Sequence, residues 1–139
     1  MSDLTSVLAL DIGTKRTGVA KANSVARIAG PLVAIHDSEG LPSRIAELAI
    51  EHNAIALVIG LPRSLSGENT AQTEYVQKIA ATIKQQVDVP VYFIDEAVTS
   101  AHAEAELKAR KKLYIKEDID MLSAVYILED FLREYPEVL

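Results

Sequence analysis

Short apolar runs separated by polar turn residues predict five β-strands in this chain. They lie at residues 7–12, 18–22, about 29–35, 54–59 and 91–94. The first three follow one another with short connections, which is the pattern of an antiparallel meander. The fourth is entirely apolar and ends at Gly60, as expected for a strand covered on both faces.

Apolar residues at helical spacing predict four helices after the meander. We expect them from Pro42 to before Asn53, from Asn69 or Thr70 to Val87, from Thr99 or Ser100 to about Arg110, and from near Asp118 to before Pro136. A meander followed by alternating helices and strands predicts an α/β fold, with a mixed five-stranded sheet and helices on both faces. Residues 1–139 contain no linker or repeat, so we expect a single domain.

Composition excludes several classes of protein. With no cysteine among 139 residues, the chain has no disulfide framework, thiolate zinc site or cysteine nucleophile. No apolar run approaches the roughly 20 residues of a membrane span, and no cationic stretch marks a signal peptide. We therefore expect a soluble cytoplasmic protein.

Charge leaves the role of one basic segment open. The net charge of −6 argues against a protein that coats nucleic acid with its whole surface. A local basic patch nevertheless exists, made of Lys108, Arg110, Lys111, Lys112 and Lys116. It is either a solvated loop or a contact for phosphates.

Acidic residues stand at the ends of two predicted strands. Asp11 lies at the end of the first strand, two residues before Gly13, while Asp95 and Glu96 end the last strand. Because Asp95 and Glu96 are adjacent on a strand, they point to opposite faces and only one is expected to meet Asp11. Each acid also has a simpler interpretation, either as a partner for turn amides or as a solvated strand terminus.

A further acid lies on the apolar face of the last helix. Helical spacing places Asp120 on the same face as Ala124, Ile127 and Phe131, which must pack inward. Asp118 is expected to cap this helix, and Asp120 could simply complement the helix dipole. Together, the acids at two strand ends and on this face favour a shared cation such as Mg²⁺ or Mn²⁺, which prefer carboxylate oxygens.

Four segments in order resemble the motifs of the YqgF family, also called RuvX, described as Holliday-junction resolvases and pre-16S ribosomal RNA nucleases. They are residues 10–20 (Leu-Asp-Ile-Gly-Thr-Lys-Arg-Thr-Gly-Val-Ala), residues 58–62 followed by Gly67 and Gln72, Asp95-Glu96 with Thr99, and residues 120–128. The resemblance covers nearly the whole chain. One departure is Ala97, where the family has an arginine, which puts substrate affinity or choice in doubt.

The resemblance implies a ribonuclease-H-like fold and an acidic metal site. Its catalytic and metal-binding residues carry over to Asp11, Glu96 and Asp120, with Asp95 as a supporting or alternative ligand. The cofactor implied is Mg²⁺ or Mn²⁺. Lys15, Arg16 and Arg63 become candidate nucleic-acid contacts, and Lys108, Arg110, Lys111 and Lys112 of the basic patch are further candidates.

The function this implies is a metal-dependent endonuclease acting on structured nucleic acid. The expected substrate is the 5′ end of precursor 16S ribosomal RNA, with branched DNA as the other candidate. A non-catalytic nucleic-acid-binding module is a second hypothesis. An actin-like ATPase fragment is a third, although the P-loop pattern is absent and the chain is short for two domains. Monomer and homodimer are both open, although a junction resolvase would need two symmetric sites.

Overall fold

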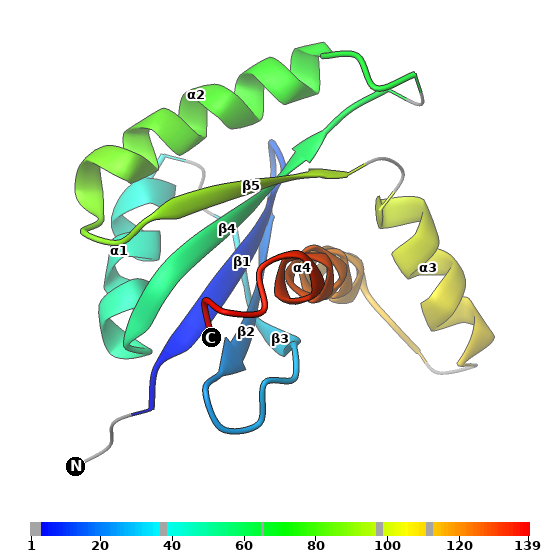
Figure 1. Ribbon diagram of the computed structural model, residues 1–139. Helices are drawn as coiled ribbons and strands as arrows, with labels where there is room; N and C mark the ends of the chain where they lie inside the picture. Colours follow the sequence, from blue (N-terminus) through cyan, green and yellow to red (C-terminus); the bar gives the residue numbers. More distant parts are fainter. Residues whose placement is uncertain (1–3, 37–38, 65, 97–98, 111–112) are drawn as a thin grey trace.

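A computed structural model describes residues 4–36, 39–64, 66–96, 99–110 and 113–139. Five strands form one sheet in the order β3-β2-β1-β4-β5 (Figure 1). They are β1 (Ser6–Ile12), β2 (Thr17–Asn23), β3 (Gly30–Ile35), β4 (Ala54–Pro62) and β5 (Val91–Glu96). β1, β2 and β3 pair antiparallel as the expected meander, whereas β4 is parallel to both β1 and β5. The predicted mixed five-stranded sheet is confirmed.

Helices lie on both faces of this sheet, as the alternation of elements predicted. They are α1 (Leu41–Glu51), α2 (Ala71–Gln86), α3 (Thr99–Ala109) and α4 (Lys116–Glu134). α1 and α2 cover one face, α4 crosses the other face, and α3 packs beside α4 (Figure 1). No helix in the described part of the chain is long and apolar enough to cross a bilayer.

The helix starts agree with the sequence in one case and differ in another. Thr70 caps α2, because its side chain accepts a hydrogen bond from the Thr73 N–H at 3.3 Å. The expectation that Asp118 caps the last helix is wrong, since α4 begins at Lys116. Asp118 instead lies in the first turn and accepts a hydrogen bond from the Ile115 N–H at 2.9 Å. A carboxylate there satisfies the N–H that precedes the helix, so the helix starts earlier.

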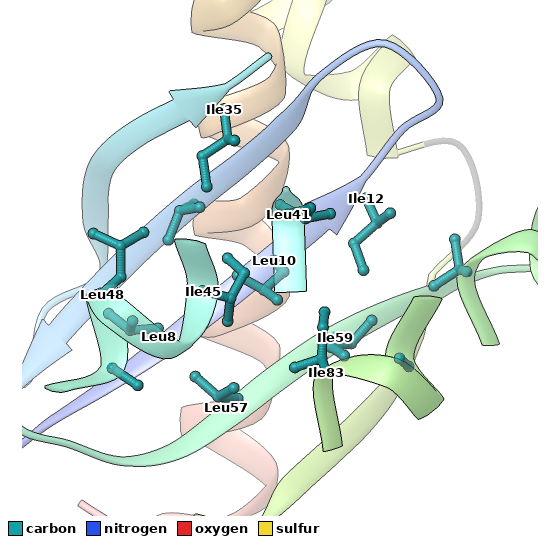
Figure 2. Packing of buried hydrophobic residues seen from close by; sticks show 14 of the residues in the cluster. Leu8, Leu10, Ile12, Ile35, Leu41, Ile45, Leu48, Leu57, Ile59 and Ile83 are labelled. Carbon is teal, nitrogen blue, oxygen red and sulfur yellow. The ribbon is translucent and has the colours of Figure 1, made fainter. Parts of the chain in front are cut away.

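The larger aliphatic core lies between the sheet and the helices α1 and α2. Leu8 and Leu10 of β1 point into it and meet Ile45 of α1 and Ile83 of α2, all essentially inaccessible to solvent (Figure 2). The intervening residues of β1 belong to a second cluster beneath α4, where they pack with Leu128 and Phe131. Alternation along β1 therefore divides its side chains between the two faces.

Candidate active site

Asp11 lies on the α4 face of the sheet, near the end of β1. It has the parity of Val7 and Ala9, which pack beneath α4, whereas Leu10 points to the opposite face. In the antiparallel pairing of β1 with β2, Asp11 is directly opposite Gly18. What covers Gly18 therefore also lies next to Asp11.

Gly18 allows the backbone of α4 to lie directly on β2. A Cβ atom at this position would be 2.0 Å from the carbonyl oxygen of Asp120 and 2.8 Å from the Met121 nitrogen. No side chain fits there, so only glycine permits this approach. Because Gly18 is the register partner of Asp11, the approach brings Asp120 beside Asp11.

Asp11 is an acid in an environment that disfavours its charge. Burial, and then the neighbouring negative charge of Asp120, raise the pKa of Asp11 to about 7. The hydroxyl of Ser123, one helical turn after Asp120, opposes this and lowers the pKa in part. Ser123 Oγ is buried and meets no partner in strict hydrogen-bond geometry within the described ranges, so this contact is weak. A nearby cation would relieve both unfavourable effects.

Arg16 is the cation that the structure places at this pair. Its Nε donates a hydrogen bond to Asp120 Oδ2 at 2.6 Å, with side-chain exposures of 23% and 17%. This bond raises the pKa of Arg16 above its usual value. The turn is held by a hydrogen bond from the Gly13 N–H to the Arg16 carbonyl at 2.9 Å. A Cβ at Gly13 would be 2.7 Å from that carbonyl oxygen, so the glycine permits the tight return of the chain.

Glu96 reaches the same face of the sheet from β5. It shares the parity of Ile94, which packs in the cluster beneath α4. Gly60 of β4 lies beside it and leaves room for Ile127 of α4, because a Cβ there would be 2.4 Å from Ile127 Cδ1 and 3.7 Å from Glu96 Cγ. The buried Glu96 Oε1 confirms that the side chain turns inward. The face beneath α4 therefore carries Asp11, Glu96 and Asp120.

These three acids share a face without forming a ready-made metal cage. Over the described ranges, no group of three or more acidic or histidine side chains is already arranged to hold a metal ion. Asp11 and Asp120 are the interacting pair, and Arg16 engages Asp120. The donor chemistry nevertheless fits a hard divalent cation, since carboxylate oxygens are the preferred ligands and the pair concentrates negative charge.

Asp95 points to the other face of the sheet. It shares the parity of Phe93, which packs on the α1 and α2 side. Its carboxylate, 69% exposed, is 3.1 Å from Arg63 Nε. The structure thus places Asp95 on the face opposite to Asp11, as expected from the alternation of Asp95 and Glu96 along β5.

The candidate nucleic-acid contacts differ in whether they already form ion pairs with acidic residues of this chain. Lys15 is exposed in the turn beside Arg16. On α3, Lys108 lies 3.9 Å from Glu104, and Arg110 pairs with Glu106. Glu106 also accepts a hydrogen bond from the Tyr126 hydroxyl, which ties α3 to α4. Three positions that the sequence singled out lie outside the described residues: Ala97, Lys111 and Lys112.

A hollow of about 370 Å³ lies between α3, α4 and the start of β3. Leu107, Arg110, Leu122 and Tyr126 are among its lining residues, whereas Asp11, Glu96 and Asp120 are not. The acids therefore lie outside this hollow.

Sequence reasoning missed two residues that shape the site. Ser123 follows Asp120 by three positions and so shares its helix face, which spacing alone could have indicated. The role of Gly18 carries only the general signal that a glycine within a strand marks a close approach. Which segment approaches depends on the long-range placement of α4.

Comparison with known proteins finds a family model and relatives that match most of this chain. Residues 5–134 match the sequence model of a family described as "RuvX: Holliday junction resolvase". A Chloroflexus aurantiacus protein named "Putative pre-16S rRNA nuclease" is 40% identical over 130 residues, covering 91% of this chain and 85% of its own. A Synechocystis protein of the same name is 37% identical over 138 residues, covering 95% of this chain and 90% of its own.

Solved structures share the architecture at much lower identity. RuvC of T. thermophilus in complex with a Holliday junction substrate has a TM-score of 0.58 at 15% identity, covering 94% of this chain and 95% of that one. The fowlpox virus Holliday junction resolvase has a TM-score of 0.58 at 14% identity, covering 93% and 99%. These likenesses concern the fold, and they confirm the ribonuclease-H-like architecture that the sequence predicted.

Proposed function

The chain belongs to the RuvX family, and from that premise we propose that it is a metal-dependent endonuclease that hydrolyses phosphodiester bonds in structured nucleic acid. The observation that carries this proposal is the Asp11–Asp120 pair. Burial and mutual repulsion raise the pKa of Asp11 to about 7, so the pair favours a bound cation. Paired carboxylates between the central strand β1 and α4 suit Mg²⁺ or Mn²⁺.

Each residue near the pair has a proposed role. Asp11 and Asp120 hold the divalent ion, and Glu96 is the third ligand on the same face. When bound, the ion supplies activation of a water molecule and stabilisation of the leaving oxygen. Lys15, exposed in the adjacent turn, contacts the phosphate backbone.

The proposed substrate is the 5′ end of precursor 16S ribosomal RNA. Support comes from the names of relatives that are 37–40% identical and cover most of the chain. The proposed place of action is the cytoplasm. The match over residues 5–134 favours this nuclease over an actin-like ATPase fragment.

The test is cleavage of a labelled RNA that spans the 5′ boundary of mature 16S RNA, in Mg²⁺ or Mn²⁺. We expect Asp11→Asn to reduce the rate by about 1000-fold or more, equivalent to roughly 4 kcal/mol of transition-state stabilisation. Asp95→Asn is the matched control, because it removes an acid on the opposite face. Binding of this RNA without metal-dependent cleavage would instead favour the non-catalytic hypothesis.

A second candidate function is resolution of four-way DNA junctions. The description of the matching family favours it. Symmetric cleavage of a junction requires two active sites and hence a dimer. A four-way junction in the same assay, with the molar mass of the protein–junction complex measured by light scattering, separates the two candidates. Paired nicks from a dimer would assign resolvase activity, and selective cleavage of the RNA would assign processing.

A further inference from the structure

Arg16 forms an ion pair that its expected role as a phosphate contact does not explain. Its Nε is bonded to Oδ2 of Asp120, one of the proposed metal ligands, at 2.6 Å. Both side chains are largely covered, with exposures of 23% and 17%. Partly buried charges are screened less by salt than exposed ones, so this pair is stronger than an ordinary surface ion pair.

A divalent ion bound at Asp120 would change the electrostatic environment of Arg16. Without metal, the guanidinium of Arg16 faces the carboxylate of Asp120, which in turn lies beside Asp11. A divalent ion beside the same carboxylates would oppose the guanidinium with like charge at short range, where the repulsion is large. Arg16 and the metal therefore compete for Asp120.

A nucleic-acid strand provides the displaced guanidinium with a new partner. Arg16 lies next to Lys15 in the β1–β2 turn, and its guanidinium has five N–H donors, of which Nε makes the contact with Asp120. Guanidinium groups bind phosphate oxygens through paired hydrogen bonds. The turn thus places Arg16 between Asp120, a proposed ligand of the metal, and Lys15, the proposed phosphate contact.

We propose that Arg16 is a positioning residue with two alternative partners: it occupies Asp120 in the metal-free protein and transfers to a substrate phosphate when a divalent cation takes Asp120. This proposal rests on the proposed nuclease function. It makes metal binding and nucleic-acid binding mutually reinforcing, because each removes a competitor of the other. By linkage, the two ligands strengthen one another by the same factor.

The first experiment measures Mn²⁺ affinity without nucleic acid, by calorimetry and by electron paramagnetic resonance. Arg16→Met is expected to bind Mn²⁺ about fivefold or more tightly than the wild type, because the competing cation is gone. Arg44→Met is the matched control, since Arg44 also pairs with an acid, Glu51 at 3.5 Å, but on α1 at the opposite face of the sheet. Its Mn²⁺ affinity should equal that of the wild type.

Each result of that experiment decides the proposal. Tighter Mn²⁺ binding by Arg16→Met supports it, and equal or weaker binding overturns it. If Arg16→Met does not fold, Arg16→Gln, which keeps a donor without the charge, must show the same increase. Absence of Mn²⁺ binding by the folded wild type overturns the proposed function as well, whereas normal binding and cleavage with no change in Arg16→Met overturns only the exchange.

The second experiment measures the linkage with the labelled precursor RNA and Ca²⁺, a divalent cation that also prefers oxygen ligands. Gel analysis after the titration checks that the RNA stays intact. Ca²⁺ should strengthen RNA binding by the wild type about fivefold or more, and by Arg16→Met distinctly less. An equal gain in both proteins would overturn the transfer of Arg16 to phosphate.

Discussion

The two faces of the sheet are built from the same strands yet differ in what they bury. On the α1 and α2 face, β1 contributes Leu8 and Leu10 to a core of large aliphatic side chains. On the α4 face, the same strand contributes Ala9 and then Asp11. On the α1 and α2 face, β1 therefore presents large aliphatic side chains. On the α4 face it presents a small residue and then an acid.

The small residues of the α4 face let α4 lie close enough to the sheet to bring Asp120 near Asp11. Gly18 and Gly60 have no space for a Cβ beneath α4, and Ala9 and Ala124 are fully buried there. Close approach of the backbone brings Asp120 to Asp11, where burial and then the charge of Asp120 raise the pKa of Asp11. Alternation along one strand therefore assigns packing to one face and the candidate chemistry to the other.

The largest expected effect on stability comes from the α1 and α2 face. Leu8→Ala should lower the free energy of unfolding by about 2–5 kcal/mol, because it leaves a cavity in a fully packed core. Urea denaturation measures the loss, and Ile50→Ala, at an α1 position that is 82% exposed, is the control. RNA cleavage per folded molecule should stay close to that of the wild type. A loss of cleavage in the folded fraction would show that packing on the α1 and α2 face also determines the activity of the α4 face.

The next effect is a pH dependence confined to the α4 face. Folding raises the pKa of Asp11 from 3.8 to about 7, so the folded state holds a proton that the unfolded state releases. The stability of the metal-free protein should therefore fall as pH rises from about 4 to about 7, by a few kcal/mol. Asp11→Asn should remove this part of the slope and be the more stable protein at pH 8.

Urea denaturation across that pH range, in buffer with a chelator, measures the effect. The difference between wild type and Asp11→Asn isolates Asp11 from the other acids. Parallel curves for the two proteins would show that Asp11 ionises in the folded state as readily as in the unfolded one.

A smaller effect tests the close approach itself. Gly18→Ala places a Cβ against the Asp120 backbone, so α4 must shift, at a cost of about 1–3 kcal/mol in stability. The displacement of Asp120 should also reduce cleavage by about 10–100-fold. Gly30→Ala is the control, because its Cβ would meet nothing within 4 Å. Equal activity of the two variants would show that the position of α4 does not matter for the site.

The fold was predictable because its signals are local. Apolar runs, turn residues and helical spacing identified the five strands and four helices, and Thr70 was a correct cap. Period-two alternation also correctly separated Asp95 from Glu96. The start of α4 was misjudged because Asp118 could bond to the preceding N–H from within the first turn.

The site was predictable only in part, since its partners are distant in the sequence. Spacing placed Asp120 on the inward face of its helix, but the contact with Arg16 joins residues 104 positions apart. Arg16 was expected to contact phosphate, and its pairing with Asp120 depends on the depth at which Gly18 lets α4 pack. Such three-dimensional distances leave no periodic signal in the sequence.

Anomalous X-ray diffraction from crystals equilibrated with Mn²⁺ shows whether the α4 face carries a metal site. We expect an anomalous peak bonded to the carboxylates of Asp11 and Asp120, with Arg16 detached from Asp120. No peak on this face, or a peak at Asp95 with the Arg16–Asp120 bond intact, would contradict this expectation.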